Sequence, residues 1–236
     1  MCRYYLWLIL MFSLHGYAKQ HVLFVTDTWY PHTNGVVTTL EQIKQALQDK
    51  GYAVTVVHPQ RFQTFQLPGY LDVDLVYDAY RAYRVIRDAN ADYVYIAVEG
   101  PLGIIARGYC LRHGIPFTTS IHTNFPDYIQ LRFGAGYHIA LDYMRWFHAP
   151  AYKTLVNTTQ QMRQLGAQGF NHLAYWGKGF DNQIFTLQSK TPHTKRIMYV
   201  GRVAPEKNIE AFLRLETPYE KIVVGDGPSL ATYKKT

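Results

Sequence analysis

Short apolar runs alternate with longer amphipathic stretches along most of the chain. The first run, residues 22–26, has the length expected of a buried parallel strand. The helix expected after Asn34, which runs to about residue 50, carries apolar residues along one face, which is typical of a helix packed on a sheet. Further helices are expected at residues 77–90 and 102–112. Further strands are expected at residues 52–57, 93–97, 117–121, 154–157 and 173–176, with two more helices bracketing the strand at 154–157. This alternation predicts a doubly wound parallel α/β sheet for residues 21–185.

The last part of the chain repeats this pattern on a smaller scale. A short apolar strand at 196–200 precedes one helix with an apolar stripe at Ile209, Phe212 and Leu213, and a second strand runs into the segment 223–228. We therefore expect a hydrophobic leader at 1–18, a Rossmann-like domain at 19–186, and the start of a second Rossmann-like domain at 187–236. Within it, residues 191–236, about 46 in all, lie near the lower limit at which a domain buries enough surface to stand alone. The pattern predicts either a chain truncated within its second domain or one half of a split enzyme.

The composition indicates a folded protein that meets an anionic partner. Hydrophobic residues make up 48% and charged residues 17%, which is enough for a core and excludes a disordered chain. The formal net charge of +7 favours a sugar nucleotide, a lipid phosphate or a bilayer surface as partner. Nucleic acid is disfavoured, because the chain has no zinc-ligand spacing, no RNP-type motif and no dense Lys/Arg run. Cys2 and Cys110 are too few for a disulfide framework and are interpreted as free thiols.

The N-terminus resembles a secretion signal in shape. Residues 4–14 are apolar except Ser13, follow Arg3, and precede the small-residue site Gly16-Tyr17-Ala18. The stretch is too short to span a bilayer as an ordinary helix. A translation start placed upstream of the true one produces the same leader. We favour a non-functional or tethering leader, and hence a cytoplasmic protein or one peripheral to the cytoplasmic membrane face, with export left open.

Two cations follow the strand at 196–200. Gly201 ends this strand and Pro205 suits the first turn of a helix, so Arg202 and Lys207 are expected at the carboxyl edge of a sheet. Arginine offers a planar fork to phosphate oxygens and lysine a mobile point charge, so the pair suits a departing diphosphate. The alternative is that both cations lie on a solvated helix start.

Polar residues also follow strands in the first domain. Asn34 and Gly35 open a helix, where backbone N–H groups attract a phosphate or a sugar hydroxyl; an ordinary capped turn is the alternative. The loop lacks the G-x-G-x-x-G fingerprint, which disfavours a nicotinamide enzyme. His122 follows the strand at 117–121, although a lone histidine is more often structural. Candidates for holding an acceptor hydroxyl are Asp27, Asn124 and Asp127, and no histidine shows metal-ligand spacing.

Arginines recur every third residue at 81, 84 and 87, interleaved with Tyr80 and Tyr83. A second aromatic group, Tyr143, Trp146 and Phe147, accompanies Arg145. Such surfaces suit contact with anionic lipid, and a solvated helix face is the alternative.

Several segments resemble, in the same order, those of the GT-B glycosyltransferases of family 4. GRVAPEKN, from residue 201, is similar to the G-R-x-x-x-E-K-N segment in which Arg and Lys hold a nucleotide-sugar diphosphate. VVGDGP, with Asp226 and Gly227, looks like the next donor-side loop. The remaining similar segments are DTWYPHTNGVVTTL at 27–40, EGPLG at 99–103, SIHTNFPDY at 120–128 and YWGKGFDNQIF at 175–185, the last resembling the interdomain linker. The resemblance runs from about residue 20 to the end, and its nearest subgroup is mannosyltransferase-like.

This resemblance implies transfer of a hexose such as mannose from a GDP- or UDP-linked donor to a lipid or glycan hydroxyl, with retention of configuration and no cofactor or metal. It implies that Gly201, Arg202 and Lys207 grip the diphosphate, that His122 contacts the transferred sugar, and that the Asn34–Gly35 loop approaches donor phosphate and acceptor. The pair of donor-domain glutamates eight positions apart is absent after Asp226. We therefore expect this chain alone to be inactive. The alternative is a catalytically silent fragment that binds an acceptor, a membrane surface or a complementary chain.

Overall fold

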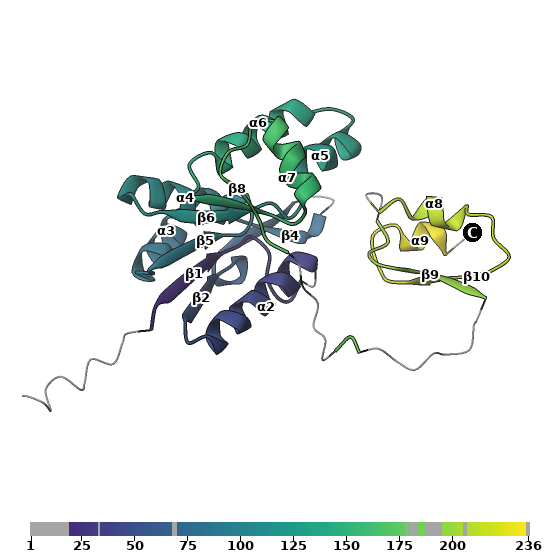
Figure 1. Ribbon diagram of the computed structural model, residues 1–236, viewed down its shortest axis with the longest axis horizontal. Helices are drawn as coiled ribbons and strands as arrows, with labels where there is room; N and C mark the ends of the chain where they lie inside the picture. Colours follow the sequence, from purple (N-terminus) through teal and green to yellow (C-terminus); the bar gives the residue numbers. More distant parts are fainter. Residues whose placement is uncertain are drawn as a thin grey trace, which may run out of the picture. The chain divides into compact units, whose positions relative to one another are not determined.

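The computed structural model describes residues 19–32, 34–67, 70–177, 179, 184–186, 195–204 and 207–234. The chain divides into two compact units, each taken by itself below (Figure 1). The first unit comprises Met1–Pro126 and Tyr137–Lys178, and the second comprises Asp127–Gly136 and Gly179–Thr236. The leader predicted at 1–18 and the Pro205-Glu206 pair of the predicted helix start lie outside the described residues.

A six-stranded parallel sheet forms the centre of the first unit. Its order is β2-β1-β5-β6-β7-β8, and every neighbouring pair runs parallel. This confirms the doubly wound α/β fold predicted from the alternating apolar runs. The strands are β1 (His21–Val25), β2 (Ala53–Val57), β5 (Tyr93–Ile96), β6 (Phe117–Ser120), β7 (Lys153–Val156) and β8 (Leu173–Tyr175).

Helices cover both faces of this sheet (Figure 1). Leu23 and Val25 of β1 lie in one hydrophobic cluster, with residues of α3, α4 and α6, while Val22 and Phe24 lie in another, with residues of α2. Alternate residues of a strand point to opposite faces, so a continuous apolar run supplies two cores. The helices of the first unit are α2 (Gly35–Asp49), α3 (Ala79–Asp88), α4 (Pro101–His113), α6 (Tyr137–His148) and α7 (Thr159–Ala167). Most of α5 (Phe125–Phe133), which precedes α6 in the chain, belongs to the second unit. Cys110 of α4 is a buried free thiol, as expected from the sequence.

An antiparallel hairpin interrupts the strand–helix alternation, and here the prediction was wrong. A short η1 turn (Pro59–Arg61) precedes strands β3 (Thr64–Leu67) and β4 (Tyr70–Val76), which pair with each other rather than with the main sheet. The segment from Leu71 to Leu75 alternates apolar and acidic residues, a pattern typical of a strand with one solvated face. The prediction also differed around β7, since two helices, α5 and α6, precede that strand and one, α7, follows it.

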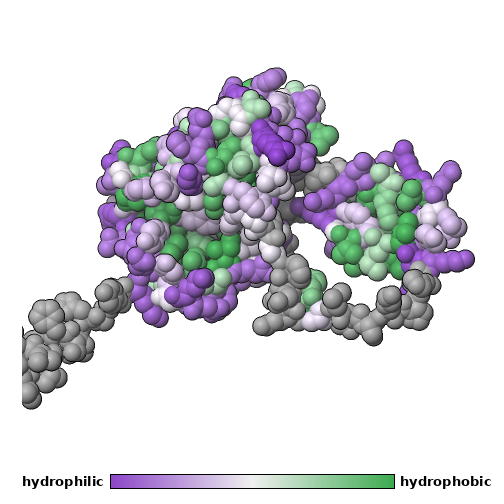
Figure 2. All heavy atoms as spheres, in the orientation of Figure 1, coloured by the Kyte–Doolittle hydropathy of each residue, from purple (hydrophilic) through white to green (hydrophobic). Residues whose placement is uncertain are grey.

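The second unit contains a strand–helix–strand arrangement. Strands β9 (Arg196–Val200) and β10 (Glu220–Val224) pair in parallel, with α8 (Ile209–Leu213) between them in the chain and the short helix α9 (Leu230–Tyr233) after them. Val203, Ala204 and Ile209 form its buried centre. Hydrophobic residues are nevertheless visible in the middle of the face of this unit that Figure 2 shows, with hydrophilic residues around them. In the part of the chain that the structure describes, no helix is long and apolar enough to cross a membrane.

Candidate functional site

The carboxyl ends of β1, β5 and β6 carry the polar residues of the candidate site in the first unit. Asp27 follows β1, and its two carboxylate oxygens accept hydrogen bonds from the backbone N–H groups of Leu102 (2.8 Å) and Gly103 (3.2 Å). These groups belong to the first turn of α4, whose own N-cap residue, Gly100, makes no side-chain hydrogen bond. Asp27 therefore caps a helix that begins far along the chain, and the positive end of that helix favours its negative charge.

The environment of Asp27 also raises its pKa. Part of the residue remains accessible, yet burial of the carboxylate is the main cause that raises its pKa from 3.8 to about 7, and the negative charge of Glu99 contributes in the same direction. The hydrogen bonds from Leu102, Gly103 and Gly100 oppose the change. A carboxyl group with this pKa changes its charge near neutral pH.

The loop between β1 and α2 is organised by Asn34. The side-chain oxygen of Asn34 accepts hydrogen bonds from the backbone N–H groups of Val36 (2.9 Å) and Val37 (3.0 Å), and its amide donates to Thr28 Oγ1 (2.8 Å). Asn34 is thus the N-cap of α2, as the alternative interpretation of this loop also required. A Cβ atom at Gly35 would meet nothing within 4 Å, so the structure leaves open space beside this backbone.

A chain of hydrogen bonds leads to His122 at the end of β6. The hydroxyl of Tyr95 lies 2.7 Å from Ser120 Oγ, and Ser120 Oγ lies 2.9 Å from His122 Nε2. Ser120 also donates to the backbone carbonyl of Ala97 (3.1 Å). The His122 ring packs beside Trp176, with centroids 5.9 Å apart. These contacts fix the orientation of the imidazole at the carboxyl edge of the sheet, where open α/β folds bind ligands.

A second buried histidine supports the loop after β5. His148 Nε2 lies 3.2 Å from Glu99 Oε1, and His148 Nδ1 lies 2.8 Å from Thr119 Oγ1, which lies 3.0 Å from Thr154 Oγ1. The backbone carbonyl of Glu99 accepts a hydrogen bond from the hydroxyl of Tyr143. Glu99, Ser120 and His148 were not singled out from the sequence. The EGPLG segment indicated the position of Glu99, whereas no local pattern indicates that α6 brings His148 to it.

The two other acceptor candidates lie around the start of α5. Asn124 is exposed in the loop before the helix, and Asp127 is an exposed acidic residue in its first turn. A carboxylate at this position stabilises the positive end of the helix. Asp127 belongs to the second compact unit, whereas Asp27, Asn34 and His122 all belong to the first.

In the second unit, the backbone around Arg202 is fixed on three sides. The N–H groups of Gly201 and Val203 donate to the carbonyls of Val224 (3.0 Å) and Asp226 (2.8 Å), and Tyr199 Oη donates to the carbonyl of Arg202 (2.8 Å). The side chain of Arg202 is exposed. The loops that follow β9 and β10 are therefore joined, and they present this arginine at the carboxyl end of the strand pair.

Glycines make this close approach of the two loops feasible. A Cβ at Gly225, which has φ of +153°, would lie 1.9 Å from the carbonyl oxygen of Gly201, and one at Gly227 would lie 2.2 Å from that of Val203. Asp226 Oδ1 accepts a hydrogen bond from the N–H of Gly227 (2.7 Å). The close packing of the two loops thus explains the glycines of the VVGDGP segment without any ligand.

Lys207 lies just before α8 rather than within it. Its N–H donates to the carbonyl of Ala204 (3.0 Å), and Asn208, with φ of +47°, separates it from the helix that begins at Ile209. The described part of the helix is therefore shorter than predicted, because a left-handed residue interrupts the helical backbone. Lys207 is an exposed cation that follows Arg202 by five positions in the chain.

Among the described residues, no group of three His, Cys, Asp or Glu side chains is arranged to hold a metal ion. In the first unit, Asp27, the Asn34–Gly35 loop, Glu99 and His122 thus all follow the carboxyl ends of strands of one parallel sheet. The structure brings together Gly201, Arg202, Asp226 and Gly227 in the second.

Comparison with known proteins gives these residues a context. The family model "Glycosyltransferase Family 4" matches residues 33–183. A GDP-mannose-dependent alpha-mannosyltransferase of Mycolicibacterium smegmatis is 24% identical over 243 residues, which cover 88% of this chain and 64% of that protein. The protein of the same description in Mycobacterium tuberculosis is 25% identical, with 87% and 62% covered. An alpha-monoglucosyldiacylglycerol synthase of Acholeplasma laidlawii is 23% identical, with 86% and 62% covered.

Solved structures share the fold at low sequence identity. An alpha-glucosyltransferase in complex with UDP and DNA has a TM-score of 0.57 and 10% identity, over 92% of this chain and 60% of that one. The catalytic domain of Starch Synthase IV from Arabidopsis thaliana, bound to ADP and acarbose, has a TM-score of 0.54 and 9% identity, over 92% and 71%. These likenesses show the GT-B type of fold that the sequence predicted.

The chain spans between 62% and 64% of the length of the three relatives named above. The match to the family model nevertheless extends over more than half of the chain, from residue 33 to residue 183, and relatives and fold agree with it. The chain belongs to Glycosyltransferase Family 4.

Proposed function

We propose that this chain takes part in transferring a hexose, mannose in the first instance, from a GDP-linked donor to a hydroxyl of a lipid or glycan, with retention of configuration. The choice of donor is supported by two relatives described as GDP-mannose-dependent alpha-mannosyltransferases. The choice of a lipid acceptor is supported by the relative described as a synthase of a glucosyldiacylglycerol. Nucleotide sugars are made in the cytoplasm, so we place the reaction there.

The observation that carries this proposal is the fixed backbone around Arg202. Its two neighbours in the chain donate hydrogen bonds to the β10 side, and Tyr199 holds its carbonyl, so the guanidinium extends from a preorganised turn. Charge that develops on a leaving diphosphate is stabilised best by donors that need no reorganisation. Lys207 supplies a second cation from the same segment.

The remaining residues receive roles on the acceptor side and around the sugar. His122, oriented by Ser120, contacts the transferred sugar. The open space beside Gly35 admits a phosphate or an acceptor oxygen close to the backbone. The chain's own cations and helix ends then take the electrostatic role that a metal has in other transferases.

The test is donor binding followed by transfer. GDP and GDP-mannose are titrated by calorimetry into the wild-type chain and into its Arg202→Ala and Lys207→Ala variants. We expect each variant to bind GDP at least about tenfold more weakly, because a charge-assisted contact to phosphate is lost. Arg214→Ala is the matched control, since Arg214 is an exposed arginine of the same unit that pairs with Glu210 instead. Where transfer of radiolabelled mannose is measurable, the same variants lower kcat by about 100-fold or more. GDP affinity equal to wild type in both the Arg202→Ala and the Lys207→Ala variant overturns the assignment of these two residues to the diphosphate.

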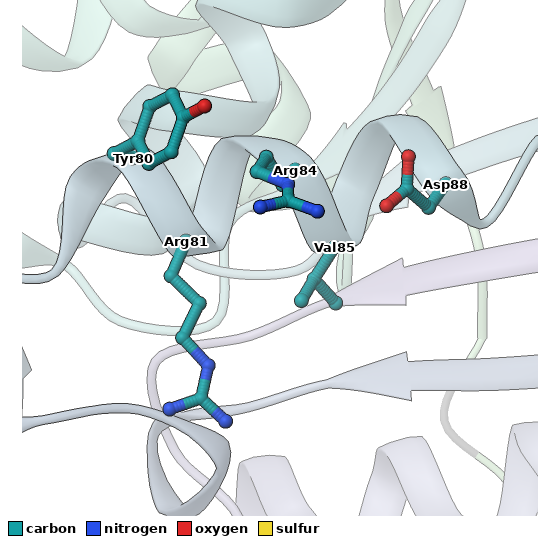
Figure 3. Close-up of a pocket in the computed structure, with 5 residues that line it drawn as sticks. All are labelled: Tyr80, Arg81, Arg84, Val85 and Asp88. Atoms are coloured by element: carbon teal, nitrogen blue, oxygen red, sulfur yellow. The ribbon is translucent and has the colours of Figure 1, made fainter.

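A membrane surface as partner is favoured by one observation on α3. Tyr80 (75% exposed), Arg81, Arg84, Val85 and Asp88 line a surface hollow with a volume of about 420 Å³. Figure 3 shows Tyr80, Arg84 and Asp88 along one side of the helix, with Arg81 extending from it on another. The Arg84 guanidinium lies 6.0 Å from the centroid of the Tyr80 ring. Exposed tyrosine beside arginine suits the interface of an anionic bilayer.

Vesicle sedimentation tests this contact. The chain is expected to bind vesicles containing phosphatidylglycerol and not vesicles of phosphatidylcholine alone. Replacing both Arg81 and Arg84 by glutamine weakens binding by about 30-fold, at about 1 kcal/mol per near-surface cation. Arg163→Gln on α7 serves as the control. Unchanged binding of the double variant indicates a solvated helix face.

A binding role without catalysis is the second candidate, and the strand pair of the second unit favours it. Met198 (58% exposed) and Val200 (70% exposed) of β9, with Val224 of β10, lie on one face of the pair. A complementary polypeptide that covers this face removes apolar surface from water. Binding of GDP by the isolated chain without any transfer of mannose favours this candidate, whereas turnover by the isolated chain contradicts it.

A further inference from the structure

We propose that Glu99 binds the acceptor, its second carboxylate oxygen accepting a hydrogen bond from the acceptor hydroxyl, and that His148 is the residue that positions it. This inference rests on the proposed function and deepens it on the acceptor side. It concerns a residue of the β5–α4 loop whose charge acts on Asp27, and the same loop accepts a hydrogen bond from Ser120 at Ala97.

The position of Glu99 is fixed on two sides. The Tyr143 hydroxyl from α6 binds its backbone carbonyl, and the His148 ring from the end of the same helix binds its carboxylate through Oε1. The His148 side chain is 2% exposed, whereas that of Glu99 is 19% exposed. The carboxylate therefore lies at the boundary of the core, held from inside by a buried group and open on its outer side.

The hydrogen bonds of this network are satisfied with a neutral imidazole and an ionised Glu99. In the tautomer whose Nε2–H donates to Glu99 Oε1, His148 Nδ1 accepts from the hydroxyl of Thr119, and Thr119 Oγ1 accepts in turn from the hydroxyl of Thr154. The buried side-chain polar atoms of Thr154, Thr119 and His148 then each have a partner, as buried groups require. Among the described residues, the second carboxylate oxygen, Oε2, accepts no hydrogen bond. An ionised carboxylate with one unfilled oxygen is a strong acceptor for a hydroxyl group.

Neighbouring groups place Glu99 at the candidate site, since its charge acts on Asp27. Ser120 Oγ joins the carbonyl of Ala97, which precedes Glu99 in the same loop, to Nε2 of His122. Asp27, the other carboxylate of this edge, uses both oxygens on the first turn of α4. Of the two carboxylates at the ends of β1 and β5, Glu99 is therefore the one with an oxygen that accepts no hydrogen bond from the described residues.

The decisive variant is Glu99→Gln. A glutamine retains a carbonyl oxygen for the His148 N–H, so the internal hydrogen bond and the packing survive, but its NH₂ group replaces the open acceptor oxygen. A merely structural Glu99 is thus little affected by this change, whereas a hydroxyl-binding Glu99 loses its function. For His148, a leucine removes the donor, and a glutamine restores an N–H donor at a similar distance.

Binding is measured with two hydroxyl probes and one donor probe. Methyl α-mannopyranoside represents a glycan acceptor, dioctanoylglycerol in detergent micelles represents a lipid acceptor, and GDP reports the donor side. We expect the wild-type chain to bind at least one hydroxyl probe in ligand-detected NMR. Glu99→Gln weakens that binding by about tenfold or more, equivalent to ~1.4 kcal/mol, while GDP affinity and the melting temperature stay unchanged. His148→Leu has a similar effect on the hydroxyl probe, and His148→Gln recovers most of the affinity. If His148→Leu fails to fold, Thr119→Val tests the same support from its other end.

The outcomes separate this inference from the proposed function. Equal binding of the hydroxyl probe by wild type and Glu99→Gln overturns the role of Glu99 and leaves the transferase proposal intact. Binding of GDP with no binding of either hydroxyl probe also overturns the role of Glu99 and leaves the transferase proposal intact. Binding of neither GDP nor a hydroxyl probe by the wild-type chain overturns both.

Discussion

The side chain of Asp27 occupies the space that a side chain at Gly100 would need. A Cβ atom built on Gly100 would lie 2.4 Å from Cγ of Asp27, well inside the contact distance of two carbon atoms. The absence of a side chain at the start of α4 thus allows a carboxylate from β1 to reach the amides of Leu102 and Gly103. The glycine and the aspartate form one capping device built from two distant parts of the chain.

Replacing this glycine should destabilise the first unit. Gly100→Ala forces Asp27 away from the amides of α4, which removes a cap and leaves buried polar groups unsatisfied, so we expect a loss of about 2 kcal/mol or more in the free energy of unfolding by urea. Gly108→Ala in the same helix is the matched control, because its Cβ would meet nothing within 4 Å. Removing a mid-helix glycine stabilises by about 0.5–1 kcal/mol. Equal effects of the two substitutions contradict the capping interpretation.

The charge of Asp27 should make stability depend on pH. Because the folded-state pKa is raised to about 7, the folded protein holds this proton more tightly than the unfolded chain does. The stabilisation is fully present below the unfolded pKa of about 4 and is lost as the pH rises through about 7. Between about pH 5.5 and about pH 7.5, the wild type should lose on the order of 1–2 kcal/mol relative to Asp27→Asn, which cannot titrate. Parallel stability curves for the two proteins, measured by urea unfolding, contradict this prediction.

Much of the fold followed from the sequence, because parallel strands are buried on both faces. The runs around β1 and β5 are apolar at consecutive positions, and this signal needs no knowledge of their neighbours. The hairpin of β3 and β4 was missed because it lies outside the main sheet and alternates acidic with apolar residues. The alternation of apolar and acidic residues indicated a strand in this segment, but this pattern was weaker than the helical periodicity on either side of it.

The candidate site was predictable only in part, for a physical reason. His122 and the Asn34–Gly35 loop follow strands directly, so their position at the carboxyl edge is a local consequence of the chain direction. The bond between Asp27 and Leu102 joins residues 75 positions apart, and the bond between His148 and Glu99 joins residues 49 positions apart. Such partners are decided by how helices pack on the sheet. For this reason the sequence showed which residues lie at the edge but not which of them are already bonded.

The second unit should be the less protected part of the chain. In β9 and β10 every residue keeps some accessible surface, whereas four of the five residues of β1 are buried. Amides of β9 and β10 are therefore expected to exchange with deuterium much faster than those of β1 and β6. Protection in β9 equal to that in β1 would show that the strand pair is covered in solution.

Gly227→Ala should make the amides of the second unit exchange still faster relative to those of the six-stranded sheet. Its Cβ would lie 2.2 Å from the carbonyl oxygen of Val203, so the loops after β9 and β10 must separate and the hydrogen bonds that fix Arg202 are lost. We expect faster exchange at the amides of Gly201 and Val203 and at least about tenfold weaker GDP binding. Exchange in the six-stranded sheet serves as the internal control and stays unchanged. Normal exchange at Gly201 in this variant would contradict the close approach of the two loops.

Gly35 offers the sharpest distinction between a structural and a binding role. The open space at its Cβ position means that Gly35→Ala adds a methyl group without a clash, and the loss of unfolded-state freedom stabilises the protein by up to about 1 kcal/mol. If a phosphate or an acceptor oxygen approaches this backbone, the same methyl group obstructs it. We therefore expect unchanged or raised thermal stability together with at least about tenfold weaker binding of GDP-mannose or of the acceptor probe. Asn34→Ala is the opposite case, because it removes the cap of α2 and lowers stability by about 1 kcal/mol. A Gly35→Ala chain that binds both ligands as tightly as wild type would place the ligand away from this loop, and the first turn of α2 would then be an ordinary capped helix start.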